Sequence, residues 1–554
     1  MNKRQLFFIL TVFFCGSLFA AGEIPTTPFI SIGYIQSFKL CDPAYNVAPC
    51  NKNDPRAAAT MKVNGITIII PENLKIIMPG TYLTAQDIFK GPKGTATGAL
   101  STPEQSGLAL EDQHPPGKPF IPFMAEISGN IAKDPASSKT EYIAGLVNIS
   151  QGVLQTSAGY IRDINYAKGE LLVTPNISNS TNQVRVQLND PPLVNDPPLP
   201  GSQFGRFSKG SKDTKDDNRF MVDQGNPTVH AMTGYPVCIP TSATGDLRCP
   251  MSNRMKDDNG NLVRRYTIGS KLAENPNGIP VATSPLCTTC DSKFMVPLAA
   301  GDYVIFSGIW IDDVDAATNT TGYISAYSLE ANLGIYTSPG ENPAYIAIEE
   351  SHWGSGGIPF DNLPQETGPG KPAVPGTNLV TRFFIVGATT DPSRNVEIIA
   401  LDVDPVTGDE KKSPRILSVV SPEPIAPLGR FRRTVEQSVF LPPTREIQAH
   451  IVGTASVKKT EVANGLEWGQ YTAPVGEYLF PEGRNWGNPE VPMNFENLCF
   501  LAKGAGPLDT LGRDKTPVAG CTDATCQLKQ LKPWPDSGHL VTDPQAACNN
   551  TFTP

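Results

Sequence analysis

The clearest structural signal in the chain is a hairpin pattern that reads Met61-Lys62-Val63-Asn64-Gly65-Ile66-Thr67-Ile68-Ile69-Ile70. An Asn-Gly pair between β-branched residues is the strongest short-range sign of a two-residue β-turn, because both turn positions need a positive φ. Strand-like patterns recur at 122–189, 294–350, 378–404 and 445–471. Only 84–90 and 524–531 look helical, and both segments are short. The sequence therefore predicts a mainly β protein.

Composition supports this fold class and excludes others. The 554 residues include 53 prolines and 49 glycines, together about 18% of the chain against roughly 12% in an average protein. Proline and glycine at this density interrupt helices, which excludes a long-helix or coiled-coil protein. The formal net charge of −9 argues against a nucleic acid as the main partner.

One strand-like stretch carries glycine at both ends and reads Gly301-Asp302-Tyr303-Val304-Ile305-Phe306-Ser307-Gly308, followed later by Tyr323-Ile324-Ser325-Ala326. This pattern resembles the strands of small OB-like barrels in secreted bacterial proteins. Residues 31–38 and 158–164 also echo one another, as repeated barrels would. The resemblance implies several small OB-like barrels or sandwiches, disulfide-stapled and joined by Pro/Gly-rich loops. It implies no ligand, because such barrels carry many unrelated functions.

These blocks and the loop-rich connectors between them predict a division into seven parts. The Pro-rich connector at 190–222 has a composition that does not favour dense packing. The predicted parts are a signal peptide at 1–21, an N-terminal β-rich segment at 22–121, an OB-like β-domain with the Pro-rich connector at 122–222, a Cys-containing, loop-rich segment at 223–293, a second OB-like β-domain at 294–362, a third β-rich domain at 363–475 and a Pro/Cys-rich C-terminal tail at 476–554.

The N-terminus has the pattern of a cleaved secretory signal. Lys3 and Arg4 precede an apolar run at 6–14, and small residues follow. A membrane anchor is the rival, but the apolar run is shorter than the roughly 20 residues that a spanning helix needs. A lipoprotein signal at Cys15 is disfavoured by the bulky Phe14 before it. We expect a secreted, extracellular or cell-surface protein without a transmembrane span in the mature chain.

Cysteine content agrees with export. Without Cys15 the count is even, which in a secreted chain predicts disulfides. The Cys287-Thr288-Thr289-Cys290 motif fits a structural disulfide better than a zinc half-site or a redox pair, because no amphipathic helix follows it. Local staples are expected at 41–50 and 238–249, and the last four cysteines should tie down the tail. The disulfide cysteines are Cys41, Cys50, Cys238, Cys249, Cys287, Cys290, Cys499, Cys521, Cys526 and Cys548.

The strongest candidates for catalysis are Glu349, Glu350 and His352, which precede a Gly-rich loop at the end of a predicted strand. On an extended backbone Glu350 and His352 share one face, as acid/base or metal-binding residues would. The alternative is a set of solvated strand-end residues. Elsewhere, His450 alternates with apolar residues, as a structural, outward-facing strand residue should.

Two patterns allow metal binding. His230 and Met232 could bind copper, although a packed or hydrogen-bonded histidine is the simpler interpretation. Asp402, Asp404 and Asp409 surround a turn, and Asp312, Asp313 and Asp315 form a second acidic turn; both fit calcium, with polar hairpin tips as the alternative. No cofactor is identified, and calcium is the ion that these turns suit.

Exposed aromatic residues are the remaining theme. Trp468 and Trp486 lie in polar, Gly-rich surroundings, where an indole face could stack against a sugar. A tryptophan that closes the end of a barrel would have the same neighbours.

The sequence favours a secreted or cell-surface β-rich binding or structural protein of unknown ligand, whose partner is an extracellular glycan or a surface protein. An extracellular hydrolase or polysaccharide-active enzyme, with Glu349, Glu350 or Glu467 in a cleft, is the second hypothesis. A secreted metal-binding protein that uses His230, Met232 and His352 is the third. An enzyme is the less favoured class, because no catalytic motif is found. A Ser-His-Asp type triad is invisible here, since its members meet only in space.

Overall fold

The structure is a computed structural model of the chain. It describes residues 27–44, 52, 57–72, 74–91, 104–114, 120–133, 140–151, 156–178, 182–192, 204–209, 216–315, 320–355, 381–402, 415–424, 428–436, 444–454, 465–474, 478–479, 506–507, 527–528, 531 and 533. About 50% of the described residues lie in strands and about 3% in helices, which confirms the mainly β prediction. The predicted signal peptide lies outside these ranges, as does most of the predicted tail.

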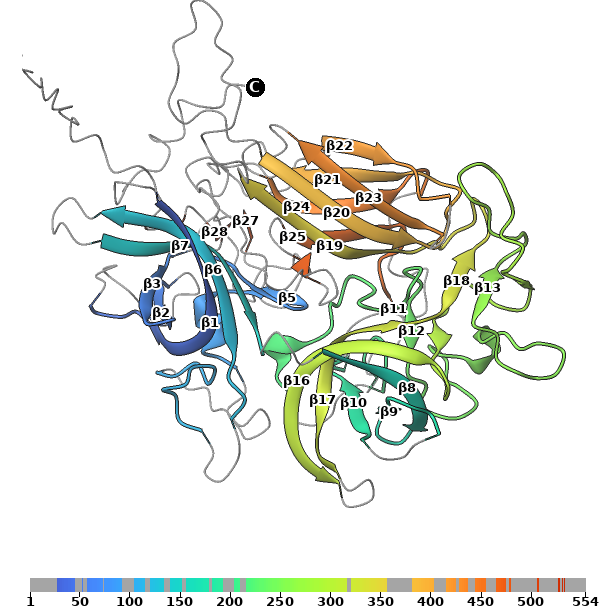
Figure 1. The fold of residues 1–554 in the computed structure, drawn as a ribbon, viewed down its shortest axis with the longest axis horizontal. Helices are drawn as coiled ribbons and strands as arrows, with labels where there is room; N and C mark the ends of the chain where they lie inside the picture. Colours follow the sequence, from blue (N-terminus) through green and yellow to red (C-terminus); the bar gives the residue numbers. More distant parts are fainter. Residues whose placement is uncertain are drawn as a thin grey trace, which may run out of the picture.

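The N-terminal module is a closed five-stranded barrel, drawn in blue and teal in Figure 1. The first three strands form an antiparallel meander, and the last two form a hairpin that pairs back to the first strand. A parallel pairing of Ile68 and Ile69 with Tyr142 and Ile143 closes the barrel. The predicted turn at Asn64 and Gly65 is present, with φ of 51° and 79°. The barrel strands are β1 (Thr27–Leu40), β2 (Ala59–Val63), β3 (Ile66–Ile70), β6 (Met124–Lys133) and β7 (Thr140–Ser150).

Three short elements connect β3 to β6 and pack against this barrel. They are β4 (Ile76–Met78), β5 (Thr81–Leu83) and α1 (Ala85–Ile88). Thr84 caps α1 through a capping box with Asp87, which satisfies backbone N–H groups at the start of this single turn. Ile88 and Phe89 are buried in the barrel core.

The second barrel repeats the connectivity of the first. A meander of three strands precedes a hairpin, and the last strand closes the barrel by pairing in parallel with the third. This is the five-stranded arrangement expected of an OB-like barrel. Its strands are β8 (Thr156–Asn165), β9 (Glu170–Thr174), β10 (Val184–Leu188), β16 (Tyr303–Asp315) and β17 (Thr320–Ala331).

The two barrels do not follow the predicted division of the chain. The first crosses the 121/122 boundary, because β6 and β7 pair with β1 and β3 rather than with β8 to β10. The second draws strands from both sides of the 223–293 segment. Strand periodicity identifies each strand but not its partner, so the predicted boundaries grouped neighbouring strands that belong to different barrels.

The described residues between β10 and β16 (189–192, 204–209 and 216–302), here called the insertion, share a hydrophobic core with the second barrel. Its core includes the fully buried Tyr235 and Tyr266. The insertion holds η1 (Asn218–Phe220), β11 (Val229–Ala231), β12 (Val237–Cys238), η2 (Met251–Asn253), β13 (Arg265–Ile268), β14 (Leu286–Cys287) and β15 (Val296–Pro297); β18 (Gly334–Thr337) pairs with β13.

The described parts of the 190–222 connector are packed, contrary to the expectation from composition. Asp190, Phe207 and Phe220 are at most 1% exposed. Polar groups become buried there because they are satisfied locally: the Asp190 carboxylate accepts hydrogen bonds from the backbone N–H groups of residues 206–208, at 2.6 to 2.8 Å.

The third module is a sandwich of two four-stranded antiparallel sheets, drawn in yellow and orange in Figure 1. Apolar side chains from both sheets, such as Ile385 and Ala449, form its core. One sheet contains β23 (Arg430–Glu436), β20 (Thr381–Thr389), β19 (Ile346–Ser355) and β26 (Tyr478–Leu479); the other contains β22 (Arg415–Val420), β21 (Val396–Asp402), β24 (Thr444–Ile451) and β25 (Gln470–Pro474). A separate two-stranded pair joins β27 (Gly506–Pro507) and β28 (Gln527–Leu528).

The three modules share their hydrophobic cores. Ile309, Ile311 and Tyr323 of the second barrel belong to the core of the first, as does Phe220. Trp468, which precedes β25, packs in the core of the second barrel. The modules therefore dock through buried apolar contacts rather than through loose linkers. Within the described ranges, no helix has the length and apolar character needed to cross a bilayer.

Candidate functional site

Two predicted disulfides are present. Cys238 bonds to Cys249 and Cys287 bonds to Cys290. The Cys287–Cys290 sulfurs lie against the second core, with the residues 4% and 8% exposed, which fits the structural interpretation of this motif. Cys41 is disulfide-bonded as well. The predictions for Cys50, Cys499, Cys521, Cys526 and Cys548 fall outside the described residues.

The Glu349–His352 region lies in β19 at the edge of the described chain. Glu349 occupies a β-bulge and pairs with Arg430 at 2.9 Å, an ion pair in which both side chains are partly exposed. The backbones of Glu350 and His352 oppose Val386 and Phe384 in the β20 register. Their proposed acid/base or metal role remains a prediction.

His230 is a buried histidine in β11, with 1% exposure. Its Nδ1 lies 2.7 Å from the Ala231 carbonyl and must donate, because that oxygen can only accept. Burial lowers the pKa of His230 to about 4, against the opposing effect of the Ala231 hydrogen bond. The imidazole is therefore neutral at pH 7. In the part of the chain that the structure describes, no three His, Cys, Asp or Glu side chains form a metal-binding group. Copper binding at His230 and Met232 remains a prediction.

Acid should destabilise the protein through His230. The unfolded chain takes up a proton near pH 6.5, whereas the folded His230 does so only near its pKa of about 4. The stability from a neutral His230 is therefore complete above pH 6.5 and is lost as the pH falls toward 4. Between pH 7.5 and pH 5, we expect the unfolding free energy of His230→Gln to fall by about 2 kcal/mol less than that of the wild type. Urea unfolding at both pH values measures this difference. Equal losses in the variant and the wild type would contradict this assignment.

The second acidic turn is neutralised by cations rather than left open for calcium. The Arg185 guanidinium lies 2.8 Å from Glu170 and 3.2 Å from Asp313, and Lys168 lies 2.6 Å from Asp315. Two protein cations thus occupy the positions next to these carboxylates, which corrects the calcium prediction for this turn. For the first turn, the structure describes only the backbone of Asp402, while Asp404 and Asp409 lie outside the described residues.

Trp468 is buried, with 4% exposure, in the core that the second barrel shares with the insertion. The ring is covered by protein, which fits the alternative of a tryptophan that closes the end of a barrel better than an indole face open to a sugar. The backbone N–H of Glu467, the residue before Trp468, bonds to the Gly225 carbonyl of the insertion. Trp486 lies outside the described residues.

Three copies of one hairpin occur in the insertion, a repeat that our sequence interpretation missed. Residues 230–236, 256–262 and 274–280 each close with an isolated β-bridge. In each hairpin, the backbone N–H of the second residue donates to the C=O of the sixth residue. The fifth residue is a glycine with φ between 73° and 87°, and its N–H donates to the C=O of the second residue. The sequences are His-Ala-Met-Thr-Gly-Tyr-Pro, Lys-Asp-Asp-Asn-Gly-Asn-Leu and Glu-Asn-Pro-Asn-Gly-Ile-Pro. The Asn-Gly signal at 64–65 is also present in two of these copies.

The copies differ in burial. The first is wedged against the sandwich, where a Cβ on Gly234 would come within 2.9 Å of the Ala347 amide. The other two are largely exposed. We use the name display loops for three segments: 241–250, which the Cys238–Cys249 disulfide holds, 256–262 and 274–280. Leu247 and Ile279 on these loops are 77% and 59% exposed.

A hydrogen-bonded acid–imidazole–hydroxyl arrangement lies on the sandwich. His450 Nδ1 is 3.3 Å from Glu397 Oε2, and His450 Nε2 is 2.8 Å from Thr454 Oγ1. Glu397 on β21 opposes His450 on β24, and Thr454 follows the end of β24 through a turn at Gly453. The outward position predicted for His450 is confirmed. Its partners were missed, because Glu397 lies 53 residues away and Thr454 lies beyond the strand.

Comparisons with protein-family models, with curated proteins and with solved structures found no match to this chain. The architecture alone therefore defines its class, a mainly β protein with two closed five-stranded barrels and two disulfides in the described part.

Proposed function

We propose that the protein is a secreted or cell-surface binding protein whose display loops recognise an extracellular partner. The observation that carries this proposal is the repeated hairpin. The same hydrogen-bonded turn is built three times, and two copies project from the insertion with their tips exposed. Loops that are rigid before binding lose less conformational entropy on association.

The base of the display loops is held firmly. Tyr266 on β13, between the second and third hairpins, is fully buried and donates to the Asn253 carbonyl at 2.7 Å. The Cys238–Cys249 disulfide ties the 241–250 loop to the second core. Such a base suits recognition by loops on a rigid scaffold.

The exposed side chains favour a surface protein as the partner over a glycan. Leu247 and Ile279 are the most exposed of the large hydrophobic residues that the structure describes. Protein interfaces combine an apolar core with a polar rim, and Trp468, a candidate for stacking on a sugar, is buried.

Export and contact are tested in the producing cells. We expect the full chain to appear outside the cell or on its surface only when residues 1–21 are present. A photo-crosslinking amino acid placed at Leu247 or Ile279 should yield a protease-sensitive adduct with a surface protein, identified by mass spectrometry. The same amino acid at Ile32, which is 40% exposed on β1 of the first barrel, is the matched control and should yield none.

Three outcomes would contradict the proposal. They are retention inside the cell, no adduct from either display-loop position, and an identical adduct from Ile32. A protease-resistant adduct that is lost on glycosidase treatment would instead assign a glycan partner.

A further inference from the structure

The geometry points to an acyl-transfer site at Glu397, His450 and Thr454 on the outer face of the sandwich, with carboxylic esters of apolar acyl groups as its substrate class. These residues, here called the triad, lie on a different module from the display loops and are independent of the proposed binding function. A hydroxyl nucleophile in hydrogen-bond reach of an imidazole, itself oriented by a third group, is the arrangement that activates serine and threonine in covalent catalysis.

The contacts have the required order. The carboxylate of Glu397 faces Nδ1 of His450, at 3.3 Å, and the opposite ring nitrogen faces the Thr454 hydroxyl, at 2.8 Å. The carboxylate can only accept, so a hydrogen bond to it keeps a proton on Nδ1 and leaves Nε2 of a neutral imidazole free to take the hydroxyl proton. The 3.3 Å distance is long for a hydrogen bond, and catalytic contacts often tighten only when substrate binds.

The hydroxyl of Thr454 has a second contact that sets its resting state. Its Oγ1 lies 2.7 Å from the Ile451 carbonyl, which can only accept the hydroxyl proton. Rotation about the Cβ–Oγ1 bond turns that proton from Ile451 toward His450 without moving either heavy atom. The resting turn and the reactive arrangement therefore differ by one hydroxyl rotation.

The backbone beside the hydroxyl is glycine. A Cβ built on Gly469 would lie 2.8 Å from Thr454 Oγ1, closer than a real contact allows, and Gly469 has a φ of +74°. A side chain at this position would push on the nucleophile. Thr454 itself is 9% exposed, whereas the side chains of His450 and Glu397 are 21% and 23% exposed, so the triad opens to solvent on the imidazole side.

The surface next to the triad gives the substrate class. Val419 opposes Glu397 in the pairing of β21 with β22, and Ile416 opposes Ile399 two residues along. Directly paired residues of antiparallel strands lie on the same face of a sheet, so Val419 borders Glu397 on the side of β21 away from His450, and Ile416 lies further along β22. Both are 51% exposed. This exposed apolar strip borders the triad at Glu397 rather than at Thr454, and it suits the distal part of an apolar acyl chain that extends across His450 and Glu397.

The reaction balances with water as the only co-reactant. Thr454 Oγ1 bonds to the acyl carbon while its proton passes to His450 Nε2. The bond from the acyl carbon to the alcohol oxygen then breaks, and Nε2 returns the proton to the leaving alcohol. Water attacks the acyl-threonine, gives its proton to Nε2, and the acid leaves as Thr454 Oγ1 regains a proton. Glu397 stabilises the imidazolium in both halves.

The test uses the full chain with p-nitrophenyl butyrate and octanoate as substrates and a fluorophosphonate as a covalent probe. We expect the probe to label Thr454, as shown by peptide mapping. Thr454→Ala should abolish labelling and lower kcat/KM by about 10³-fold or more, while Thr454→Ser, which keeps the hydroxyl, should retain both. Glu397→Gln should lower kcat, and Ile416→Asp should raise KM more for octanoate than for butyrate.

Thr434→Ala, at an exposed hydroxyl on the other sheet, is the matched control and should leave turnover unchanged. Circular dichroism and urea unfolding establish that each variant folds. A wild-type protein that neither hydrolyses these esters nor takes the label would overturn the proposal. Labelling at another residue, or turnover that survives Thr454→Ala, would overturn it as well.

Discussion

Replacing Arg219 with methionine is expected to lower the free energy of unfolding by about 3–5 kcal/mol, because the change strands a buried carboxylate. Arg219 is 4% exposed and Asp217 is fully buried, and their closest contact is 2.7 Å. Nε and Nη2 of Arg219 donate to both carboxylate oxygens of Asp217. Methionine fills a similar volume but leaves the charge of Asp217 without a cation.

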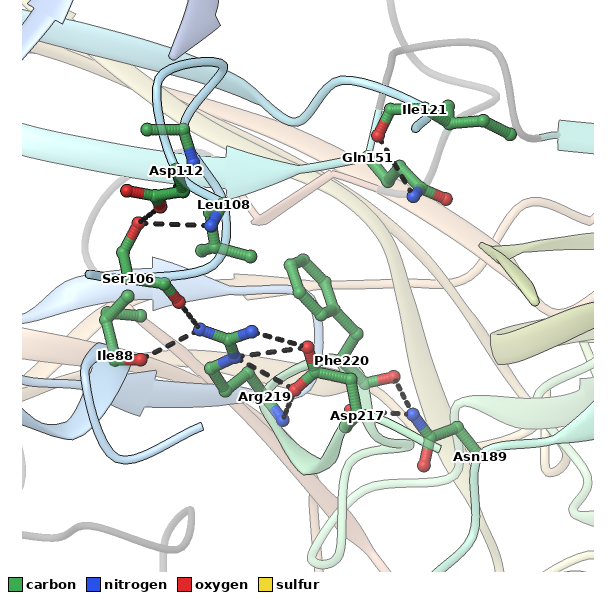
Figure 2. A network of polar contacts seen from close by, with 11 residues as sticks. Ile88, Ser106, Leu108, Asp112, Ile121, Gln151, Asn189, Asp217, Arg219 and Phe220 are labelled. Atoms are coloured by element: carbon green, nitrogen blue, oxygen red, sulfur yellow. Dashed lines mark hydrogen bonds and ion pairs between the residues drawn. The ribbon is translucent and has the colours of Figure 1, made fainter. Parts of the chain in front are cut away.

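The same guanidinium also connects two modules. Its Nη1 donates to the carbonyl oxygens of Ile88 and Ser106, at 2.8 and 2.7 Å, and both belong to the segment that covers the first barrel. Figure 2 shows Arg219 between these two carbonyls and Asp217, with Asn189 holding the Asp217 and Phe220 carbonyls from the other side. The loss should therefore weaken the docking of the insertion onto the first barrel.

Urea unfolding of the full chain, followed by tryptophan fluorescence, measures the effect. Lys39→Met is the matched control, because Lys39 and Glu111 form an exposed ion pair with a 3.9 Å contact, and such pairs contribute at most about 1 kcal/mol. Asp217→Asn combined with Arg219→Met should be less destabilising than the sum of the single changes, since it removes both charges together. A loss under 1 kcal/mol for Arg219→Met would show that Asp217 is solvated.

Local patterns predicted the strands well, because the alternation of a strand and the residues of its turns are adjacent in the sequence. The hairpin at 61–70 is the clearest case, since Asn64 and Gly65 adopt the positive φ values that the sequence requires. Partner choice is different. The closing contact of the first barrel joins Ile68 to Tyr142, and no periodicity within either strand identifies the other.

Burial was also hard to predict where distant segments cover a residue. Trp468 has polar and glycine neighbours in the sequence, which suggested exposure, yet the insertion packs over it. Asp313 and Asp315 looked like an open acidic turn, and Arg185, 128 residues from Asp313, neutralises them. The chemistry of a charged turn therefore depends on which side chains the fold brings to it.

The second large effect concerns this Arg185 cluster. We expect Arg185→Met to lower the free energy of unfolding by about 3–5 kcal/mol. Arg185 is 1% exposed, and Glu170, at 2.8 Å, is 4% exposed. Burial lowers the pKa of Arg185, but the hydrogen bonds and charges of Glu170, Asp313 and Asp315 outweigh it, so the pKa is raised and the guanidinium stays charged.

Lysine cannot replace this arginine well. Arg185 donates from Nε to Glu170 and from both terminal nitrogens to Asp313, at the carboxylate and at the backbone carbonyl, and its guanidinium lies over the Tyr323 ring at 5.5 Å. An ammonium group is a point charge without this planar fork. Arg185→Lys should therefore recover only part of the stability lost in Arg185→Met.

A matched control lies in the same cluster. Lys168 binds Asp315 at 2.6 Å but is 46% exposed, so Lys168→Met should change the unfolding free energy by about 1 kcal/mol or less. Adding Glu170→Gln to Arg185→Met should restore stability, because the carboxylate left buried is then replaced by a neutral amide. If Glu170→Gln deepened the loss instead, the instability would come from lost packing against Tyr323. Recovery would show that the penalty is the unpaired charge of Glu170, and that Arg185 is required because the barrel buries that carboxylate.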